Sequence, residues 1–361
     1  MSVRTSLEAA IIADPDAREA HAVYADHLLE HGDPAGEFIA VQLALEAAPD
    51  DGPLLARERA LIAERTEALR RLFYVAMRAI RDPVWRRGLL HSIAVHGDAY
   101  SHETADACAE LLADPEARFL RDLVVRSVTV MHGTPTPDDG NLVAALAKAI
   151  PASLRRLFFD PLDFQLSWTR LTSLEPLYPR LAQLEELSIV AGDLVLGRVE
   201  LPALRSLALV TGGLGAHVLR SIAEATWPRL ERLEVHLGTD RYGGDCTLAD
   251  VAPILEGAML PHVTTLALCN CEFGDELAEA VAASKILPQL RVLELSGSTT
   301  SDAGARAILD RGASFAHLAK LDLSDCYLTS ATLTELAAFG ANVLGQRVPD
   351  DNGDRYCTLD E

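Results

Sequence analysis

A triplet of leucines that occurs twice within forty residues constrains the fold more than any other feature of the chain. Within residues 289–328, the first triplet returns almost unchanged: Leu290, Leu293 and Leu295 are followed by Leu318, Leu321 and Leu323. The segment between them, SDAGARAIL, favours a short helix, so each unit predicts a strand, a turn, a helix and the next strand. A single unit of this kind cannot bury its own apolar face, and neighbouring units must therefore stack into a continuous core.

The same pattern, L-x-x-L-x-L with Ile, Val or Phe allowed, occurs nine times. Its first positions are Leu90, Leu120, Leu154, Leu184, Leu204, Leu230, Val263, Leu290 and Leu318. Most intervals leave room for a helix outside the strand, but the 20-residue interval around Val195-Leu196 predicts an extended or single-turn connection. This is the pattern of a leucine-rich repeat. It predicts an α/β solenoid over residues 83–345, shaped as a horseshoe or arc, with a parallel sheet inside and helices mostly outside.

Alternation along each strand predicts which side chains face the inside of the curve. The leucines point into the core, so the residues between them line the concave surface. Its middle is small or apolar and its flank is charged, and a protein or peptide partner could dock there. The candidate contacts are Phe158, Glu186, Ser188, Arg232, Glu234, His236, Glu294 and Asp322. We expect charge reversal of Glu186, His236 or Glu294 to abolish such a complex without lowering thermal stability.

The segment from Gly238 to Cys246, GTDRYGGDC, makes its repeat one of the longest. Insertions in solenoids gather on one edge and often bind ligands, so Asp240, Tyr242 and Asp245 are further candidate contacts. The alternative is a structural loop that needs glycine for positive φ and aspartate for turn hydrogen bonds. In the helix that follows, Pro253 is best tolerated in a first turn, which predicts Asp250 as the N-terminal cap.

Residues 1–82 carry helical periodicity, including a long helix from about Leu54 to Ile80. The stretch DPDAREAHAVYADHLLEHGDPAGEFIAVQ resembles a bacterial helical domain, the repeat-companion domain, that precedes repeat arrays. The matching words are Asp14-Pro15, Tyr24-Ala25-Asp26, Gly32-Asp33-Pro34 and Gly36-Glu37-Phe38-Ile39. The resemblance implies a helical cap, which a solenoid needs at its exposed end. Residues 346–361 form a tail, or a cap at the other end.

A second resemblance lies within the array. Thr211-Gly212-Gly213-Leu214, Leu237-Gly238-Thr239-Asp240 and Tyr242-Gly243-Gly244-Asp245 are similar to a family of bacterial leucine-rich-repeat proteins of unassigned function, with ribonuclease-inhibitor-like repeats. Those proteins tend to be encoded beside radical-SAM and ATP-grasp enzymes. The resemblance therefore implies an alternative role, as an accessory or substrate-presenting subunit for modifying enzymes.

The formal net charge of −21 argues against several classes of partner. So much negative charge repels phosphate backbones, which excludes nucleic acid and anionic membrane as expected partners. No apolar run approaches the roughly 20 residues that span a bilayer, and the first residues are not those of a secretory signal. Six cysteines in 361 residues make no disulfide framework, and we expect a cytoplasmic protein.

Candidate chemistry is sparse. His236, Cys246, Cys269 and Cys271 invite a zinc interpretation. However, Cys271 and Cys326 occupy equivalent repeat positions where an inward-pointing side chain completes the turn, so we expect no metal. Glu234 and His236 share a face without a nucleophile, and no phosphate-binding or dinucleotide motif is present. We predict a protein without catalytic activity or cofactor that binds a protein or peptide; a small-ligand sensor at the glycine-rich edge is a further alternative.

Overall fold

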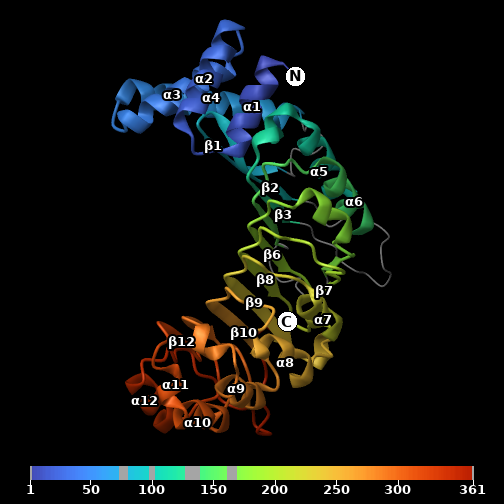
Figure 1. Cartoon of the computed structure of the whole chain (residues 1–361), viewed down its shortest axis with the longest axis vertical. Helices are drawn as coiled ribbons and strands as arrows, with labels where there is room; N and C mark the ends of the chain where they lie inside the picture. The colour runs from blue at the N-terminus through green and yellow to red at the C-terminus, as the bar shows by residue number, and fades with distance from the viewer. Residues whose placement is uncertain (1, 73–79, 97–101, 127–138, 161–168, 360–361) are drawn as a thin grey trace.

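The computed structural model describes residues 2–72, 80–96, 102–126, 139–160 and 169–359. Within them, a long sheet of ten strands runs through an elongated, curved molecule (Figure 1). The sheet lines the inner side of the curve, and the helices of the array lie on the outer side. This mixed α/β layout, with a mostly parallel sheet, is the coarse architecture that the leucine triplets predict.

The strands follow the chain in order, as stacking of sequential repeats requires. The order in the sheet is β1-β2-β3-β4-β6-β8-β9-β10-β11-β12, and a separate pair is formed by β5 and β7. Their bounds are β1 Ile80–Arg86, β2 Leu89–His96, β3 Asp122–Arg126, β4 Arg156–Phe159, β5 Arg170–Leu171, β6 Glu186–Val190, β7 Asp193–Leu194, β8 Ser206–Val210, β9 Arg232–Gly238, β10 Thr265–Cys271, β11 Val292–Glu294 and β12 Lys320–Asp322. Only β1 and β2 pair antiparallel within the ten-stranded sheet.

One row of leucines crosses the array from end to end. Ile93 pairs with Leu123, Leu123 with Leu157, and the row continues through the middle leucine of each triplet to Leu321. These side chains are buried, and at 4% exposure Leu321 is the least covered of them. All nine predicted strands are therefore present in the predicted register. The interval around Val195-Leu196 carries only β7 between β6 and β8, which confirms the predicted helix-free connection.

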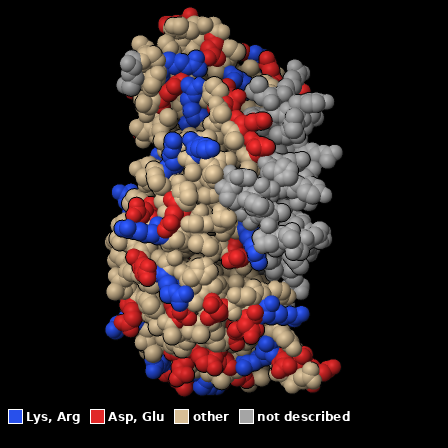
Figure 2. Space-filling view, turned by 90° about the vertical axis from the view of Figure 1, so that its right-hand side faces the viewer, with Lys and Arg blue, Asp and Glu red and all other residues tan. Residues whose placement is uncertain are grey.

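The helices occupy the longer intervals. Their bounds are α1 Val3–Ala13, α2 Arg18–Glu30, α3 Ala35–Ala47, α4 Gly52–Leu72, α5 His102–Ala113, α6 Asp139–Ala149, α7 Ala216–Glu224, α8 Leu248–Glu256, α9 Gly274–Ala282, α10 Asp302–Asp310, α11 Gly312–Phe315 and α12 Ser330–Ala338. Figure 2 shows the outer side, where basic and acidic side chains are interspersed among the residues that are described.

Two predicted bounds are wrong. Helix α8 begins at Leu248, with Thr247 and Asp250 forming a capping box, and Ile80 belongs to β1 instead of the long helix.

Aspartates at the starts of the outer helices connect neighbouring repeats. Asp275, in the first turn of α9, accepts hydrogen bonds from the backbone N–H of Ser301 (2.7 Å) and Gly304 (3.0 Å) at the start of α10. Asp302, in turn, accepts from the backbone N–H of Thr329 (2.9 Å) before α12. Each carboxylate thus satisfies donors that a helix start leaves unpaired, and it fixes the spacing between two repeats.

The four N-terminal helices pack against the first strands through the β1–β2 turn. Gly88 has φ +70°, and its backbone N–H donates to Oε1 of Gln42 at 2.6 Å. Arg87 pairs with Glu46 at 2.7 Å and donates to the backbone oxygen of Asp16 at 2.9 Å. Tyr24 is buried at 2% exposure, and its hydroxyl donates to Glu8 Oε1 at 2.9 Å. These are contacts that a cap would make; that the array needs this helical unit stays a prediction.

The last residues fold back over the final repeats. Residues 342–347 run beside β12 and the turn after it, with the backbone N–H of Leu323 donating to the carbonyl of Asn342 at 2.8 Å. Beyond them, Arg355 pairs with Asp275 at 3.0 Å, and the backbone N–H of Leu359 donates to Asn270 Oδ1 at 2.8 Å. The C-terminal segment therefore covers an edge that β12 would otherwise leave unpaired.

Candidate functional site

The inner face of the sheet carries the alternation that the sequence predicts. In β6 and β8 the leucines and isoleucine are buried, and the residues between them are partly exposed. Strand β10 departs from the pattern. Ala267 and Cys269 lie on the inner face of the sheet, where partial exposure is expected, yet they are 0% and 4% exposed. Both are small side chains between larger neighbours on β9 and β11, which cover them.

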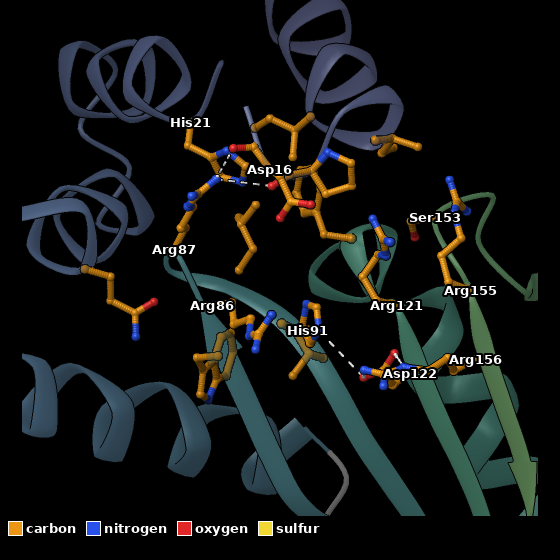
Figure 3. Close-up of a pocket in the computed structure, with 18 of the residues that line it drawn as sticks. Asp16, His21, Arg86, Arg87, His91, Arg121, Asp122, Ser153, Arg155 and Arg156 are labelled. Atoms are coloured by element: carbon orange, nitrogen blue, oxygen red, sulfur yellow. Dashed lines mark hydrogen bonds and ion pairs between the residues drawn. The ribbon is translucent and has the colours of Figure 1, made fainter. Parts of the chain in front are cut away.

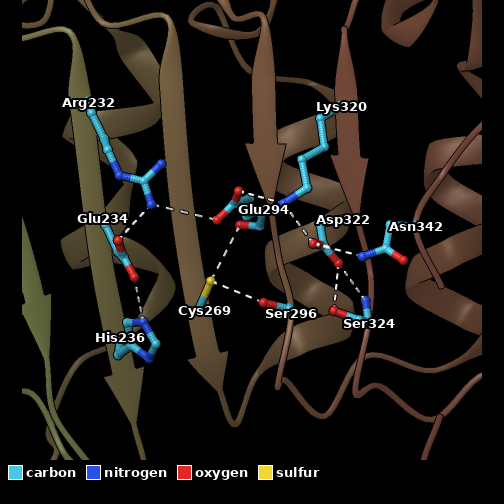
Figure 4. Close-up of polar contacts among 10 residues, drawn as sticks. All are labelled: Arg232, Glu234, His236, Cys269, Glu294, Ser296, Lys320, Asp322, Ser324 and Asn342. Atoms are coloured by element: carbon cyan, nitrogen blue, oxygen red, sulfur yellow. Dashed lines mark hydrogen bonds and ion pairs between the residues drawn. The ribbon is translucent and has the colours of Figure 1, made fainter. Parts of the chain in front are cut away.

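A network of ion pairs crosses the inner face of the sheet from β9 to β12 (Figure 4). Nη2 of Arg232 lies 2.7 Å from Glu234 and 3.8 Å from Glu294. Nζ of Lys320 lies 2.8 Å from Glu294 and 3.0 Å from Asp322. Because Ala267 pairs in register with both glutamates, its methyl group leaves room for the contact between β9 and β11. The candidate contacts on this half of the face are therefore engaged with each other.

Glu234 is the most strongly perturbed acid of this network. His236 Nε2 lies 3.0 Å from its Oε1, and this hydrogen bond, with that from Arg232, lowers the pKa of Glu234 to about 2 against the opposing effect of burial. The side chain of Glu234 is 22% exposed. A pair of this kind could polarise a bound group, but no nucleophile belongs to the contacts described around it.

Asp322 is 6% exposed and so has little surface for a partner. Its carboxylate accepts hydrogen bonds from Ser324 Oγ at 2.6 Å and from Asn342 Nδ2 at 3.0 Å. Burial raises the pKa of Asp322, but these bonds and the one from Lys320 hold it below its ordinary value. The residue fixes β12 against the segment that covers it.

The other half of the face is less occupied. Phe158, Ser188 and the residues of β8 beside them are partly exposed, and Ser188 pairs in register with Phe158 on one side and Ala208 on the other. Glu186 is also partly exposed and lies beside Arg156 in the neighbouring strand. The structure thus divides the predicted contacts into an ion-paired group at β9–β12 and a group at β4–β8, Phe158, Glu186 and Ser188, that forms no ion pair among the described residues.

The glycine-rich segment is packed tightly by its backbone. Gly238 has φ +71°, and a Cβ there would lie 2.0 Å from the carbonyl oxygen of Gly212. Asp245 accepts from the backbone N–H of Ala216 at 2.5 Å, so it caps helix α7. Asp240 is exposed, and the ring of Tyr242 lies 5.8 Å from the guanidinium of Arg241. The structural interpretation accounts for Gly238 and Asp245, while Asp240 and Tyr242 stay candidate contacts.

The cysteines follow their repeat positions. Cys271 and Cys326 are fully buried, as predicted for residues that complete the turns. Cys269 Sγ lies 3.5 Å from Ser296 Oγ, and burial raises the pKa of this thiol to about 11. Thiols with raised pKa are poor metal ligands and poor nucleophiles at neutral pH.

A cleft of about 780 Å³ lies where the helical unit meets the first repeats (Figure 3). Its walls come from the α1–α2 turn, the β1–β2 turn and the N-terminal ends of several strands. Six arginines line it: Arg86, Arg87, Arg121, Arg155, Arg156 and Arg205. Sequence reasoning missed this site, although a cation after the first leucine of a triplet recurs in LRDL, LRRL and LRSL.

Comparisons with known proteins support the fold and give no evidence on function. No family model matches the chain, and no curated protein does. A Bacteroides fragilis protein of known crystal structure is similar, with a TM-score of 0.62 and 24% identity over 74% of this chain and 78% of that one. An internalin from Listeria monocytogenes gives a TM-score of 0.30 and 15% identity over 72% of this chain and 82% of its own, which is too distant to carry an argument. Neither concerns radical-SAM or ATP-grasp enzymes, so the accessory role stays a prediction.

No helix among the described residues combines the length and the apolar character that crossing a bilayer demands.

Proposed function

We propose that this protein is a non-catalytic cytoplasmic scaffold that binds a protein or peptide across the inner face of its sheet. The observation that carries the proposal is the open inner face. Between the helical unit and the last repeat, no described helix crosses it (Figure 1). Nine parallel strands at about 4.8 Å spacing give a surface roughly 40 Å long, enough for about ten extended residues.

The two halves of this face suit different parts of a partner. Phe158 and Val210, with the small Ser188 on the strand between theirs, offer a surface on which an apolar side chain could be desolvated. Arg232 and Lys320 have side chains 37% and 45% exposed at the edge of the ion-pair network. Interfaces commonly combine an apolar centre with a polar rim, and the rim governs the rate of encounter and the specificity.

Ser188→Arg tests the proposal, because it places a long cation in the middle of the β4–β8 half of the face. Ser221→Arg, on the outer helix α7, is the matched control. Tagged wild-type protein and both variants are expressed in the source cells and cross-linked, and the captured partner is then purified and titrated calorimetrically. We expect Ser188→Arg to weaken binding at least about tenfold, which corresponds to 1.4 kcal/mol. All three proteins should unfold within about 4 °C of one another. Equal binding by the two variants would rule out the inner face as the interface.

A further inference from the structure

The cleft between the helical unit and the first repeats brings six arginines together, and two of them lack a carboxylate partner among the described residues. Arg121 and Arg155 reach into it from the strands, and Arg86 lies beside His91 (Figure 3). Among the described residues, Arg86 and Arg121 have no ion-pair partner, and Nε of Arg121 is buried without a hydrogen bond.

Six carboxylates also line the cleft, and four of them contact other described side chains; the six are Asp16, Glu46, Glu58, Asp122, Glu185 and Glu186. Asp122 accepts from Nε of Arg156 at 2.7 Å, and Glu46 holds Arg87. Glu185 lies 3.6 Å from Arg155, which is a loose contact, and Asp16 lies on the wall made by the helical unit. The fold therefore leaves positive charge on the wall made by the strands.

The titration behaviour of neighbouring groups agrees with this geometry. Burial lowers the pKa of His91, Asp122 opposes the shift, and the charges of Arg86, Arg121 and Arg156 lower the pKa further. Burial also lowers the pKa of Arg155, and the charge of Arg121 adds to the effect. Like charges held together in a partly dehydrated site cost stability, and a bound anion would remove that cost.

Apolar side chains also line part of the cleft. Leu89 and Phe119 are 7% and 8% exposed, and Trp85 has a buried indole N–H without a hydrogen bond among the described residues. A volume of about 780 Å³ is in the range of clefts that hold small organic molecules. The site thus combines a cationic end with an apolar wall.

We propose that this cleft binds a small organic oxyanion, a carboxylate or a phosphate ester. The charged oxygen atoms of the ligand bind to Arg121, Arg155 and Arg86. Its apolar part packs against Leu89, Phe119 and Trp85. Planar guanidinium groups match both kinds of oxyanion by paired hydrogen bonds. The cleft shares Glu186 and Ser206 with the inner face, but Phe158, Ser188 and Val210 of the proposed function do not line it. It adds a ligand to a protein otherwise described as a scaffold.

Calorimetric titration of the full chain tests this with four probes: phenyl phosphate, phenylacetate, inorganic phosphate and benzyl alcohol. Comparison of phenyl phosphate with phenylacetate shows which charged group the cleft prefers, and benzyl alcohol tests whether binding needs a negative charge. Arg121→Gln removes the unpaired guanidinium. Arg291→Gln is the matched control, because Arg291 is exposed at the same repeat position beside β11, outside the cleft. Arg121→Lys keeps the charge but loses the paired geometry.

We expect one aromatic oxyanion to bind the wild type and Arg291→Gln alike, and to bind Arg121→Gln at least about tenfold more weakly. Arg121→Lys should lie between them, and benzyl alcohol should not bind. The proposal is overturned if no probe binds the wild type at about 10 mM, a limit well above useful affinities. It is also overturned if both glutamine variants bind equally, while inorganic phosphate binding as tightly as phenyl phosphate would remove the role of the apolar wall. Ser188→Arg should leave this binding intact, so failure here is separable from failure of the scaffold.

Discussion

The two ends of the sheet differ in how far their charged side chains form ion pairs. At β9–β12, Arg232, Glu234, Glu294 and Lys320 form a connected network across the inner face. At the other end, Arg86 and Arg121 line a cleft without an ion-pair partner among the described residues. The first arrangement stabilises the chain by itself, whereas the second costs stability until something else supplies negative charge. A paired network is thus evidence about folding, and an unpaired cluster is evidence about binding.

The largest expected effect comes from reversing a charge inside the network. Glu294→Lys would place a third cation against Arg232 and Lys320, at a side chain only 18% exposed. We expect it to lower the free energy of unfolding by about 2 to 4 kcal/mol. Glu186→Lys, on the open half of the face, should cost less than about 1 kcal/mol. Urea denaturation of both variants measures the difference.

This prediction corrects an expectation from the sequence, that reversal at Glu186, His236 or Glu294 would leave stability intact. The structure supports that expectation for Glu186 and argues against it for Glu294. If the two reversals destabilised the chain equally, the division of the inner face into a paired and an open half would be wrong.

Glu234 gives a smaller effect with a defined pH dependence. Its pKa is lowered from 4.5 to about 2. The folded state therefore holds this proton less tightly than the unfolded state, and the carboxylate contributes stability that is complete above pH 4.5 and is lost as the pH falls towards 2. The contribution amounts to at most about 3 kcal/mol. In Glu234→Gln, stability at pH 7 should be lower by about 1 to 3 kcal/mol, and its fall between pH 4.5 and pH 2 should be correspondingly shallower.

Glu231→Gln is the matched control for that measurement. Glu231 pairs with Arg205 at 2.5 Å, but its side chain is 53% exposed. Exposed pairs contribute between about 0 and 1 kcal/mol, so this variant should keep the acid-dependent slope of the wild type. A slope that changes as much in Glu231→Gln as in Glu234→Gln would show that general charge, and not the bond to His236, controls it.

The fold was predictable because one residue type marks it. The middle residue of each of the nine triplets, leucine in eight and Ile93 in the first, occupies one ladder position, and a ladder of similar side chains is visible as a period in the sequence. The missed elements lack such a period. Thr247 and Asp250 do form the local capping signal T-x-x-D, but the weight given to Pro253 concealed it. Strand β1 pairs with β2 through the turn at Arg87-Gly88, where both residues have positive φ, and it carries no leucine triplet.

The sites were less predictable, for a physical reason. Alternation gives the face on which Arg232 or Glu294 lies, but the choice of ion-pair partner depends on side-chain torsions and on the small residue between them. The junction cleft needs the α1–α2 turn, the β1–β2 turn and the first repeats to meet, and no local pattern encodes that meeting. Position in the repeat could have indicated the row of Arg121, Arg155 and Arg205, but not the lack of acidic partners for Arg121.

The smallest predicted effect concerns that lack of partners. Arg121→Gln removes a cation whose charge lowers the pKa of both Arg155 and His91, as expected for cations held close together. We expect the free energy of unfolding without ligand to rise by about 0.5 kcal/mol at low salt. The gain should vanish near 1 M salt, where charges are screened beyond about 3 Å. Arg291→Gln should show no such dependence, because Arg291 is exposed and lies outside the cleft. Loss of stability in Arg121→Gln at every salt concentration would mean that Arg121 is a structural residue, and the charge asymmetry between the two ends of the sheet would then carry no information about a ligand.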